Sequence, residues 1–192
     1  GDIISYIQGV CDSFLLMADK KQIHFSFFSS VDHFTMAFDA DKMGKIVMNL
    51  LANAFKFTPE GGRVTVMLEH LQEENEVIEI KVADTGIGVS DEEKEHIFDR
   101  FYQTENKEAG ENTGGTGIGL SLVKDFVTLH GGDVTVFDNI GKGAVFVVHI
   151  PVKHVDIHII LLIRCQYLVC CLNHPDSMWM KLTEVSFRSC WW

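Results

Sequence analysis

Three polar side chains in segment 49–59 have the types and spacing to hold a metal-bound phosphate. Asn49, Asn53 and Lys56 follow one another at i, i+4 and i+7, so on a helix they share one face. An amide oxygen is a suitable ligand for Mg²⁺, and a lysine ammonium is a compact charge for phosphate. A solvent-facing helix edge gives the same pattern, and it is the simpler interpretation of this segment taken alone. A separate apolar stripe, which we expect to pack on a sheet, consists of Met43, Ile46, Val47, Leu50, Leu51 and Ala54.

An aspartate and two glycines directly follow a segment with strand-like alternation. Asp84 comes after 77–83, and Gly86 and Gly88 come two and four residues later. A carboxylate at a strand end can accept a hydrogen bond from the exocyclic amine of adenine, and glycines let the backbone approach a flat ring closely. The alternative is a simple Asp-x-Gly turn, which is frequent in proteins.

A glycine-rich segment at 114–120 leads into a stretch of helical periodicity that ends near Gly131. Free backbone N–H groups converge where such a loop meets a helix N-terminus, and the helix dipole there favours an anion. The segment is not a Walker A loop, because no Lys-Ser or Lys-Thr pair follows the glycines. It is not a dinucleotide fingerprint either, because the spacing is G-x-G-x-G and no strand is expected before it. The alternative is a flexible linker, and the helix that follows directly argues against it.

Segment 97–103 precedes a polar, aperiodic stretch, 102–115, which we expect to be a mobile loop. Arg100 could reach phosphate oxygens when this loop closes. The alternative is a short amphipathic turn that packs Phe98 and Phe101 into the core, and we expect part of that packing in either case.

Composition limits the classes of function. The chain has 192 residues, of which 46% are apolar, and a net charge of −11. This apolar share is typical of a globular protein, and the acidic balance gives no support for a nucleic-acid partner. Five cysteines in no even framework suit a reducing compartment. The sequence begins with Gly1 and has no signal-peptide pattern, so we expect a piece of a longer protein or an incomplete gene product.

Hydrophobic periodicity places these segments in a two-layer α/β fold. We expect helices over 2–21, from a cap at Asp41 to about 55, over 91–98 and over 116–131. We expect strands that pair in sequence order, namely 24–30 with 34–39, 63–71 with 77–83, and 133–137 with 144–150. The fold class is therefore α/β, a two-layer sandwich in which a mixed, mostly antiparallel sheet has helices on one face.

Together and in this order, the four segments resemble the N, G1, F and G2 boxes of the catalytic and ATP-binding domain of sensor histidine kinases. The resemblance covers about residues 1–151 and is greatest to sensor kinases of hybrid two-component systems. It implies the Bergerat fold of the ATPase superfamily shared with gyrase and MutL. It also implies ATP and Mg²⁺ as ligands and transfer of the terminal phosphate to a histidine on another polypeptide segment.

The resemblance implies a role for each matching position. Asn53 would coordinate Mg²⁺ with the help of Asn49, and Asp84 would bind the adenine amine. Lys56 and Arg100 would be the catalytic cations at the phosphates. The other positions would shape the pocket: Phe57, Gly86 and Gly88 beside the adenosine, and Gly115, Thr116, Gly117, Gly119 and Leu120 around the phosphates.

Three positions or segments distinguish this chain within the superfamily. Members that hydrolyse ATP have a glutamate base where this chain has Asn49, so we expect slow hydrolysis. The family usually has threonine at the position of Ala144, and the missing hydroxyl should weaken nucleotide binding by ~1 kcal/mol. None of the nine histidines lies in a phosphoacceptor pattern, and we expect His130 to be structural.

The resemblance also implies a domain organisation and partners. Residues 1–21 would be a helical join to a missing dimerisation and phosphoacceptor domain, 22–151 the ATP-binding domain, and 152–192 a tail of unknown role. The partners would be that phosphoacceptor domain and, through it, a response regulator. The fragment itself would not insert into a membrane, because Asp156, His158 and Arg164 interrupt the apolar stretch of the tail. Its location would be cytoplasmic, within a membrane-anchored parent kinase.

Two other functions are compatible with these residues. A protein-serine kinase of the anti-sigma type shares the fold, although the helical start and segment 97–103 favour a histidine kinase. A module that binds ATP without transferring phosphate is supported by Ala144 and by the missing acceptor histidine.

Overall fold

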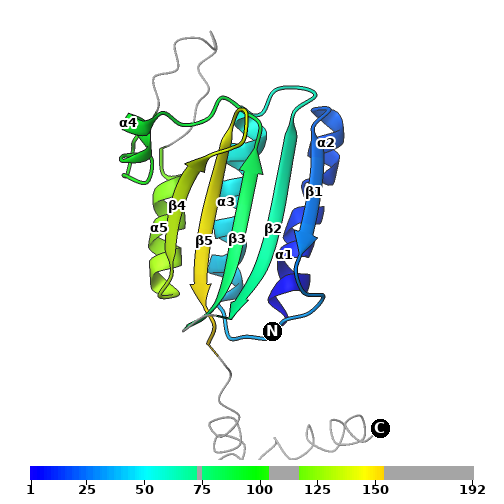
Figure 1. The fold of residues 1–192 in the computed structure, drawn as a ribbon, viewed down its shortest axis with the longest axis vertical. Helices are drawn as coiled ribbons and strands as arrows, with labels where there is room; N and C mark the ends of the chain where they lie inside the picture. The colour runs from blue at the N-terminus through cyan, green and yellow to red at the C-terminus, as the bar shows by residue number, and fades with distance from the viewer. Residues whose placement is uncertain (73–74, 104–116, 154–192) are drawn as a thin grey trace, which may run out of the picture. The chain divides into compact units, whose positions relative to one another are not determined.

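A five-stranded sheet in the order β1-β2-β3-β5-β4 forms one layer of the computed structural model (Figure 1). The strands are β1 (His24–Ser29), β2 (Arg63–Gln72), β3 (Glu76–Asp84), β4 (Asp133–Asp138) and β5 (Ala144–Pro151). Strand β1 is parallel to β2, and the other neighbours are antiparallel. The structure describes residues 1–72, 75–103 and 117–153. All of them lie in the first of the two units into which the chain divides, Gly1–His154.

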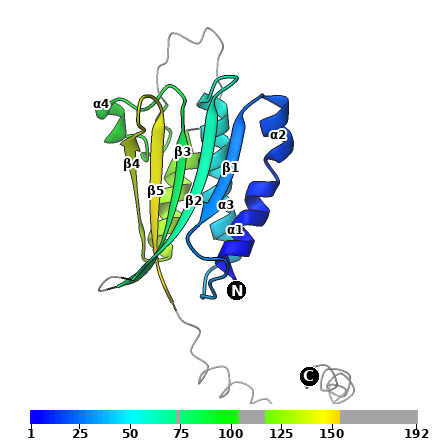
Figure 2. The same ribbon diagram turned by 45° about the vertical axis from the view of Figure 1, so that its right-hand side comes forward.

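Helices form the second layer, on one face of the sheet (Figure 2). They are α1 (Ile3–Asp12), α2 (Leu15–Lys20), α3 (Ala40–Phe57) and α5 (Gly119–Leu129), while the short α4 (Asp91–Lys94) follows β3. The expected two-layer α/β sandwich with a mixed, mostly antiparallel sheet is thus confirmed. No helix in the described residues is long and apolar enough to cross a membrane.

Helix α3 lies at the centre of the helical layer and is capped at both ends. The Asp39 carboxylate accepts a hydrogen bond from the Lys42 N–H at 3.1 Å, so Asp39 is the N-cap and the expected cap at Asp41 was wrong. At the other end, the Thr58 hydroxyl donates to the Ala54 carbonyl at 2.6 Å. Pro59 follows, and it cannot continue the helix because it has no N–H.

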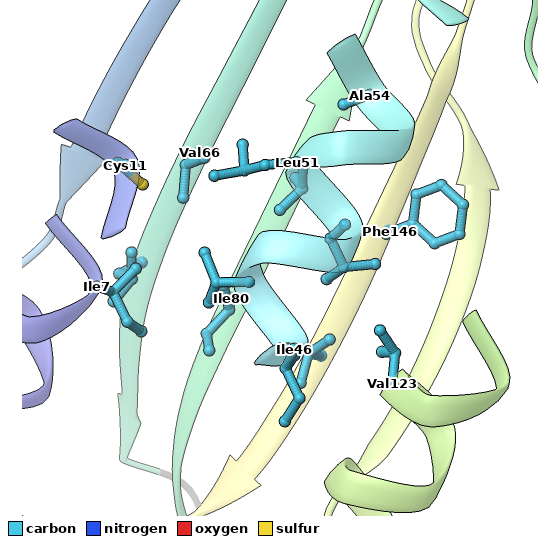
Figure 3. Close-up of a cluster of buried hydrophobic side chains, with 14 of the residues drawn as sticks. Ile7, Cys11, Ile46, Leu51, Ala54, Val66, Ile80, Val123 and Phe146 are labelled. Carbon is cyan, nitrogen blue, oxygen red and sulfur yellow. The ribbon is translucent and has the colours of Figure 1, made fainter. Parts of the chain in front are cut away.

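The core lies between α3 and the sheet and extends under α1 and α5 (Figure 3). Alternate residues of β2 and β3, such as Val66 and Ile80, face α3 and are fully buried. Helix α1 contributes Ile7 and Cys11 to the same cluster. Each large apolar side chain buried in this way contributes about 1.5–3 kcal/mol, and this packing fixes the position of α3 and therefore of its polar face.

His130 connects α5 to the start of α3. Its Nε2 accepts a hydrogen bond from the Asp39 N–H at 3.3 Å, and its Nδ1 lies 2.8 Å from the Phe126 carbonyl, to which it donates. With one nitrogen accepting and the other donating, the buried ring is a neutral tautomer. His130 therefore has the structural role expected of it.

The expected pairing of 24–30 with 34–39 was wrong. Strand β1 pairs in parallel with β2, in the register His24 to Arg63, and α3 forms the crossover between them. Segment 34–39 contains one isolated bridge, from Thr35 to Asp2, and its Met36 is buried in the core. Alternation identifies an extended segment but does not identify its partner.

Two expected helices are shorter than their periodic patterns. Segment 2–21 forms two helices, because Ser13 ends α1 and its hydroxyl donates to the Val10 carbonyl at 2.6 Å. Segment 91–98 is helical only to Lys94 and continues as turns. The Ser90–Glu93 capping box fixes the start of this helix.

A charged cluster lies on the sheet face that points away from the core. Glu79 receives the Lys81 ammonium at 2.6 Å and the His149 Nε2 at 3.0 Å, while the His149 Nδ1 lies 3.2 Å from Asp133. Partial burial of the ring lowers the pKa of His149, but hydrogen bonds to Asp133 and Glu79 outweigh it, so the net pKa is raised. The cluster thus stabilises the charged imidazolium.

Candidate functional site

Asn49 and Asn53 lie on one half-buried face of α3, as the spacing predicts. The Asn49 Nδ2 donates to the Lys45 carbonyl at 2.7 Å. Its Oδ1 is directed to the start of α5, because a Cβ built on Gly119 would lie only 2.9 Å from it. The first residue of α5 therefore packs against Asn49, and glycine keeps the amide oxygen uncrowded.

Asp84, the last residue of β3, is buried, with 5% of its surface exposed. Its Oδ1 accepts hydrogen bonds from the Gly86 N–H at 2.8 Å and from the Ala144 N–H at 3.4 Å. Burial raises the pKa of the Asp84 carboxyl above its ordinary value, and the two N–H donors partly offset this rise by stabilising the ionised form. In the described part of the chain both of these bonds go to Oδ1, so Oδ2 is the oxygen suited to a ligand.

The turn after Asp84 touches the C-terminal end of α3. A Cβ on Gly86 would lie 2.5 Å from the Phe57 carbonyl oxygen, so only glycine fits there. Gly88 has a φ of +81°, a left-handed conformation that favours glycine. The ends of α3 and β3 lie at the same end of the sheet (Figure 1).

The turn after Asp84 and the glycine-rich start of α5 therefore both contact α3, which carries the motif with Asn49 and Asn53. Asn49 contacts Gly119, Phe57 contacts Gly86, and Asn53 lies one helical turn from each. This arrangement places amide oxygens between a helix N-terminus and a buried carboxylate. The described residues contain no group of three or more His, Cys, Asp or Glu side chains suited to a metal. Amide oxygens such as those of Asn49 and Asn53 are of the kind that Mg²⁺ accepts as ligands.

Lys56 and Phe57 are in contact with each other at the end of α3. The Lys56 Nζ lies 4.9 Å from the centre of the Phe57 ring, a cation–π distance, and both side chains are half-buried. A flat, partly exposed ring beside the Gly86 turn suits contact with the adenosine part of a nucleotide. The expected contact of Lys56 with phosphate stays a prediction.

Two segments meet at the base of the glycine-rich region. The Phe101 N–H donates to the Gly117 carbonyl at 2.9 Å, and a Cβ on Gly117 would lie 2.8 Å from the Phe101 backbone. Gly117 has a φ of +66°. Gly119 and Leu120 open α5, which begins later than the expected position 116, whereas Gly115, Thr116 and most of the expected mobile loop lie outside the described residues.

Arg100 lies close to this base but its guanidinium binds a carboxylate. The Arg100 Nη2 is 2.8 Å from the Asp125 Oδ2 on α5, and both side chains are largely exposed. An exposed pair of this kind is worth at most about 1 kcal/mol, so phosphate could replace the carboxylate. Phe98 packs edge-to-face on Phe146, with ring centres 6.3 Å apart, while Phe101 is 72% exposed. Part of the expected packing is therefore confirmed: Phe98 packs against the core, whereas Phe101 does not.

The sequence did not point to Asn139. In the turn between β4 and β5, its Nδ2 donates to the Asp84 main-chain carbonyl at 2.7 Å. An asparagine before Gly141 is typical of a turn, but nothing in the sequence indicates a contact with a residue 55 positions earlier. Ala144 was noted only for its missing hydroxyl, and its N–H binds the Asp84 carboxylate.

Comparison with known proteins gives consistent matches. Residues 38–154 match the model of the histidine kinase-, DNA gyrase B- and HSP90-like ATPase family. Over 153 residues, the chain is 41% identical to hybrid signal transduction histidine kinase D of Dictyostelium discoideum. The match covers 78% of this chain and 10% of that protein. The chain thus spans a small part of the relatives that it matches.

Solved structures give the same result. The mycobacterial sensor histidine kinase MprB superposes with a TM-score of 0.65 at 26% identity and covers 81% of this chain and 97% of that structure. Full-length ShkA, solved in complex with AMPPNP, superposes with a TM-score of 0.68 at 30% identity and covers 81% of this chain and 31% of that structure.

Proposed function

Because this chain belongs to the histidine kinase-, DNA gyrase B- and HSP90-like ATPase family, as the catalytic and ATP-binding domain of a sensor histidine kinase, we propose that it binds Mg-ATP and presents the terminal phosphate to a histidine. That histidine belongs to a separate dimerisation and phosphoacceptor domain of a two-component system. A response regulator then receives the phosphate through that domain.

One observation carries the proposal. The polar face of α3 contacts the Gly86 turn at Phe57 and the start of α5 at Asn49. Three groups therefore lie in order beside α3 or on it. They are a buried carboxylate suited to adenine, asparagine amides suited to a metal, and a helix N-terminus suited to phosphate. A nucleoside triphosphate has complementary groups in the same order.

Each group of residues in the site has its own role in binding the nucleotide. The Asp84 Oδ2 accepts a hydrogen bond from the exocyclic amine of adenine, while Gly86 and Gly88 let the backbone approach the ring. Asn53 and Asn49 hold Mg²⁺, which when bound neutralises charge on the phosphates. The remaining positions surround the phosphates, with Arg100 and Lys56 as cations and Gly115, Thr116, Gly117, Gly119 and Leu120 as loop and helix-start contacts.

The domain supplies only the donor half of the reaction. None of the nine histidines lies in a phosphoacceptor pattern, and His130 forms structural hydrogen bonds, so the acceptor histidine belongs to another segment. Asn49 cannot take a proton from water, because an amide is not a base, and this favours transfer over hydrolysis. Phosphoryl transfer depends mainly on positioning and charge neutralisation, which this set of residues provides.

The same proposal assigns the parts of the chain. Residues 1–21 lead from the dimerisation domain, 22–151 bind ATP, and 152–192 are a tail without an assigned role. The isolated chain is inactive without its acceptor domain, and the parent is a membrane-anchored hybrid kinase with this domain on the cytoplasmic side.

Phosphotransfer to a separately supplied dimerisation and phosphoacceptor segment tests the proposal. We expect acid-labile, base-stable labelling of that segment from γ-labelled ATP with wild type, and none with Asn53→Ala or Asp84→Asn. Thr135→Ala, exposed on β4 and outside the site, serves as the matched control and should transfer normally.

The assay also separates the alternatives. A folded wild type that binds Mg-ATP but labels no histidine would indicate an ATP-binding regulatory module, and labelling of a serine-bearing partner would indicate an anti-sigma-type kinase. A wild type no more active than the variants, with all of them folded, would refute the proposal.

A further inference from the structure

The end of β3 is held differently on its two sides. On the β2 side the ladder reaches Asp84, which pairs with Val64, and the Thr85 N–H donates to the Arg63 carbonyl at 3.0 Å. On the β5 side the last paired residues are Ala83 and Val145. The Asp84 carbonyl thus lies beyond the ladder, and the Asn139 Nδ2 binds it at 2.7 Å.

Asn139 is itself fixed in the turn between β4 and β5. Its Oδ1 accepts from the Ile140 N–H at 2.8 Å, and its own N–H donates to the Gly143 carbonyl at 3.0 Å. Both ends of its amide are therefore in use. Swinging the side chain away from Asp84 would break a contact inside the turn as well.

The same turn approaches Asp84 closely. A Cβ on Gly143 would lie 1.9 Å from the Asp84 carbonyl oxygen, so the turn backbone lies directly against that peptide. The next residue, Ala144, donates its N–H to the Asp84 Oδ1. The turn therefore contacts both the main chain and the carboxylate of Asp84.

We propose that Asn139 is a positioning residue for recognition of the adenine amine. It fixes the Asp84 peptide where the β3–β5 ladder has ended, and so sets the direction of the carboxylate oxygen that meets the purine. Asn139 does not touch the nucleotide. This inference rests on the proposed function, in which Asp84 binds the exocyclic amine.

The physical reason is the directionality of hydrogen bonds. They weaken steeply when the donor, hydrogen and acceptor depart from a line. The Asp84 carboxylate is anchored through Oδ1, so a rotation of its peptide would turn Oδ2 away from the amine. The effect should therefore be confined to ligands that carry the amine.

Asn139→Asp removes the donor but adds a negative charge, so the uncharged Asn139→Ala is measured beside it. Asn139→Asp keeps the shape and the acceptor for the Ile140 N–H, but it replaces the Nδ2 donor by an oxygen. Affinities are measured by calorimetry for Mg-ATP and for the Mg complex of purine riboside triphosphate, which lacks the exocyclic amine. Ile140→Ala is the matched control, because its side chain is fully exposed in the same turn.

We expect Asn139→Asp to weaken Mg-ATP binding about 5- to 10-fold, the loss of roughly one hydrogen bond, and to change purine riboside triphosphate binding less than about twofold. Asn139→Ala should behave in the same way, and in an Asp84→Asn background either substitution should have no further effect on affinity. Ile140→Ala should bind both nucleotides like wild type.

Equal weakening of both nucleotides, or an unchanged preference for ATP in folded Asn139→Asp, would overturn the inference. If Asp84→Asn still abolished the preference for ATP, the proposed function would stand although the role of Asn139 was refuted. If the wild type bound no Mg-ATP, or if Asp84→Asn left its affinity unchanged, both would fail.

Discussion

Asp84→Asn should weaken nucleotide binding without lowering stability. The buried carboxylate of Asp84 contributes to binding, but in its ionised form it opposes folding. Asparagine has the same shape, and its Oδ1 can still accept from the Gly86 and Ala144 N–H groups. The difference lies at the second atom, where an NH₂ donor replaces the Oδ2 acceptor. An amine of adenine would then meet another donor.

The loss of binding can be bounded from one interaction. A hydrogen bond to a charged group contributes about 1.5–3 kcal/mol, which corresponds to an affinity loss of roughly 10- to 150-fold. Because burial raises the pKa of the Asp84 carboxyl, wild-type affinity for Mg-ATP should also fall with decreasing pH sooner than an ordinary aspartate would predict. The variant should lack this part of the pH dependence.

The effect on the nucleotide-free protein has the opposite sign. A carboxyl whose pKa is raised on folding stabilises the fold below its unfolded pKa, and this contribution is lost as pH rises through the folded pKa. At pH 7 the ionised Asp84 therefore opposes folding, and Asp84→Asn should melt at the same temperature as wild type or higher. Calorimetric titration and thermal melting without nucleotide measure the two effects. Unchanged Mg-ATP affinity, or a clear fall in melting temperature, would refute the reasoning.

Three further substitutions test separate contacts, and a fourth, Gly9→Ala, is the control for the first. Gly119→Ala should displace the Asn49 amide, whose Oδ1 lies 2.9 Å from the new Cβ, and lower Mg-ATP affinity about fivefold without a fall in melting temperature. Gly9→Ala, an exposed helix position with nothing within 4 Å, should raise stability by about 0.5–1 kcal/mol and leave calorimetric affinity unchanged; equal affinities of the two variants would contradict the role of Asn49. Ala144→Thr should strengthen Mg-ATP binding by ~1 kcal/mol, about fivefold, through a new hydroxyl, and no gain would mean that the hydroxyl finds no partner. His149→Gln should lose more stability near pH 6 than near pH 9, because a raised histidine pKa stabilises the fold below the unfolded pKa and is lost as pH rises through the folded one; an equal loss at both pH values in denaturant titrations would contradict this.

Local patterns predicted the layers of the fold, whereas the resemblance to sensor histidine kinases predicted that the motifs form one site. The spacing of Asn49 and Asn53 gave one face of α3, which the structure confirms. The glycines after Asp84 and before α5 were expected to let the backbone approach a nucleotide, and the structure shows them packed against Phe57, Phe101 and Asn49. The face of α3 depends on residues within one or two turns of each other, so periodicity is sufficient to predict it. The roles of these residues toward ATP and Mg²⁺ stay predictions.

Contacts between distant segments could not be predicted in this way. The parallel pairing of β1 with β2 crosses the whole of α3, and alternation contains no information on the partner of a strand. The hydrogen bond of Asn139 to Asp84 and the ion pair of Arg100 with Asp125 depend on how separate elements pack. Short motifs identify the residues of this site, whereas tertiary packing determines which other residues contact them.

The parallel position of β1 at the sheet edge also bears on the order in which the chain assembles. Strands β2 and β3 are joined by a short connection and can pair early, since their closure costs little entropy. Strand β1 must wait until α3 has crossed the sheet, because its register with β2 spans 39 positions, from His24 to Arg63. The surface on which α1 and α2 pack is thus completed late, so a nascent chain would expose the apolar side of residues 1–20 until α3 is in place.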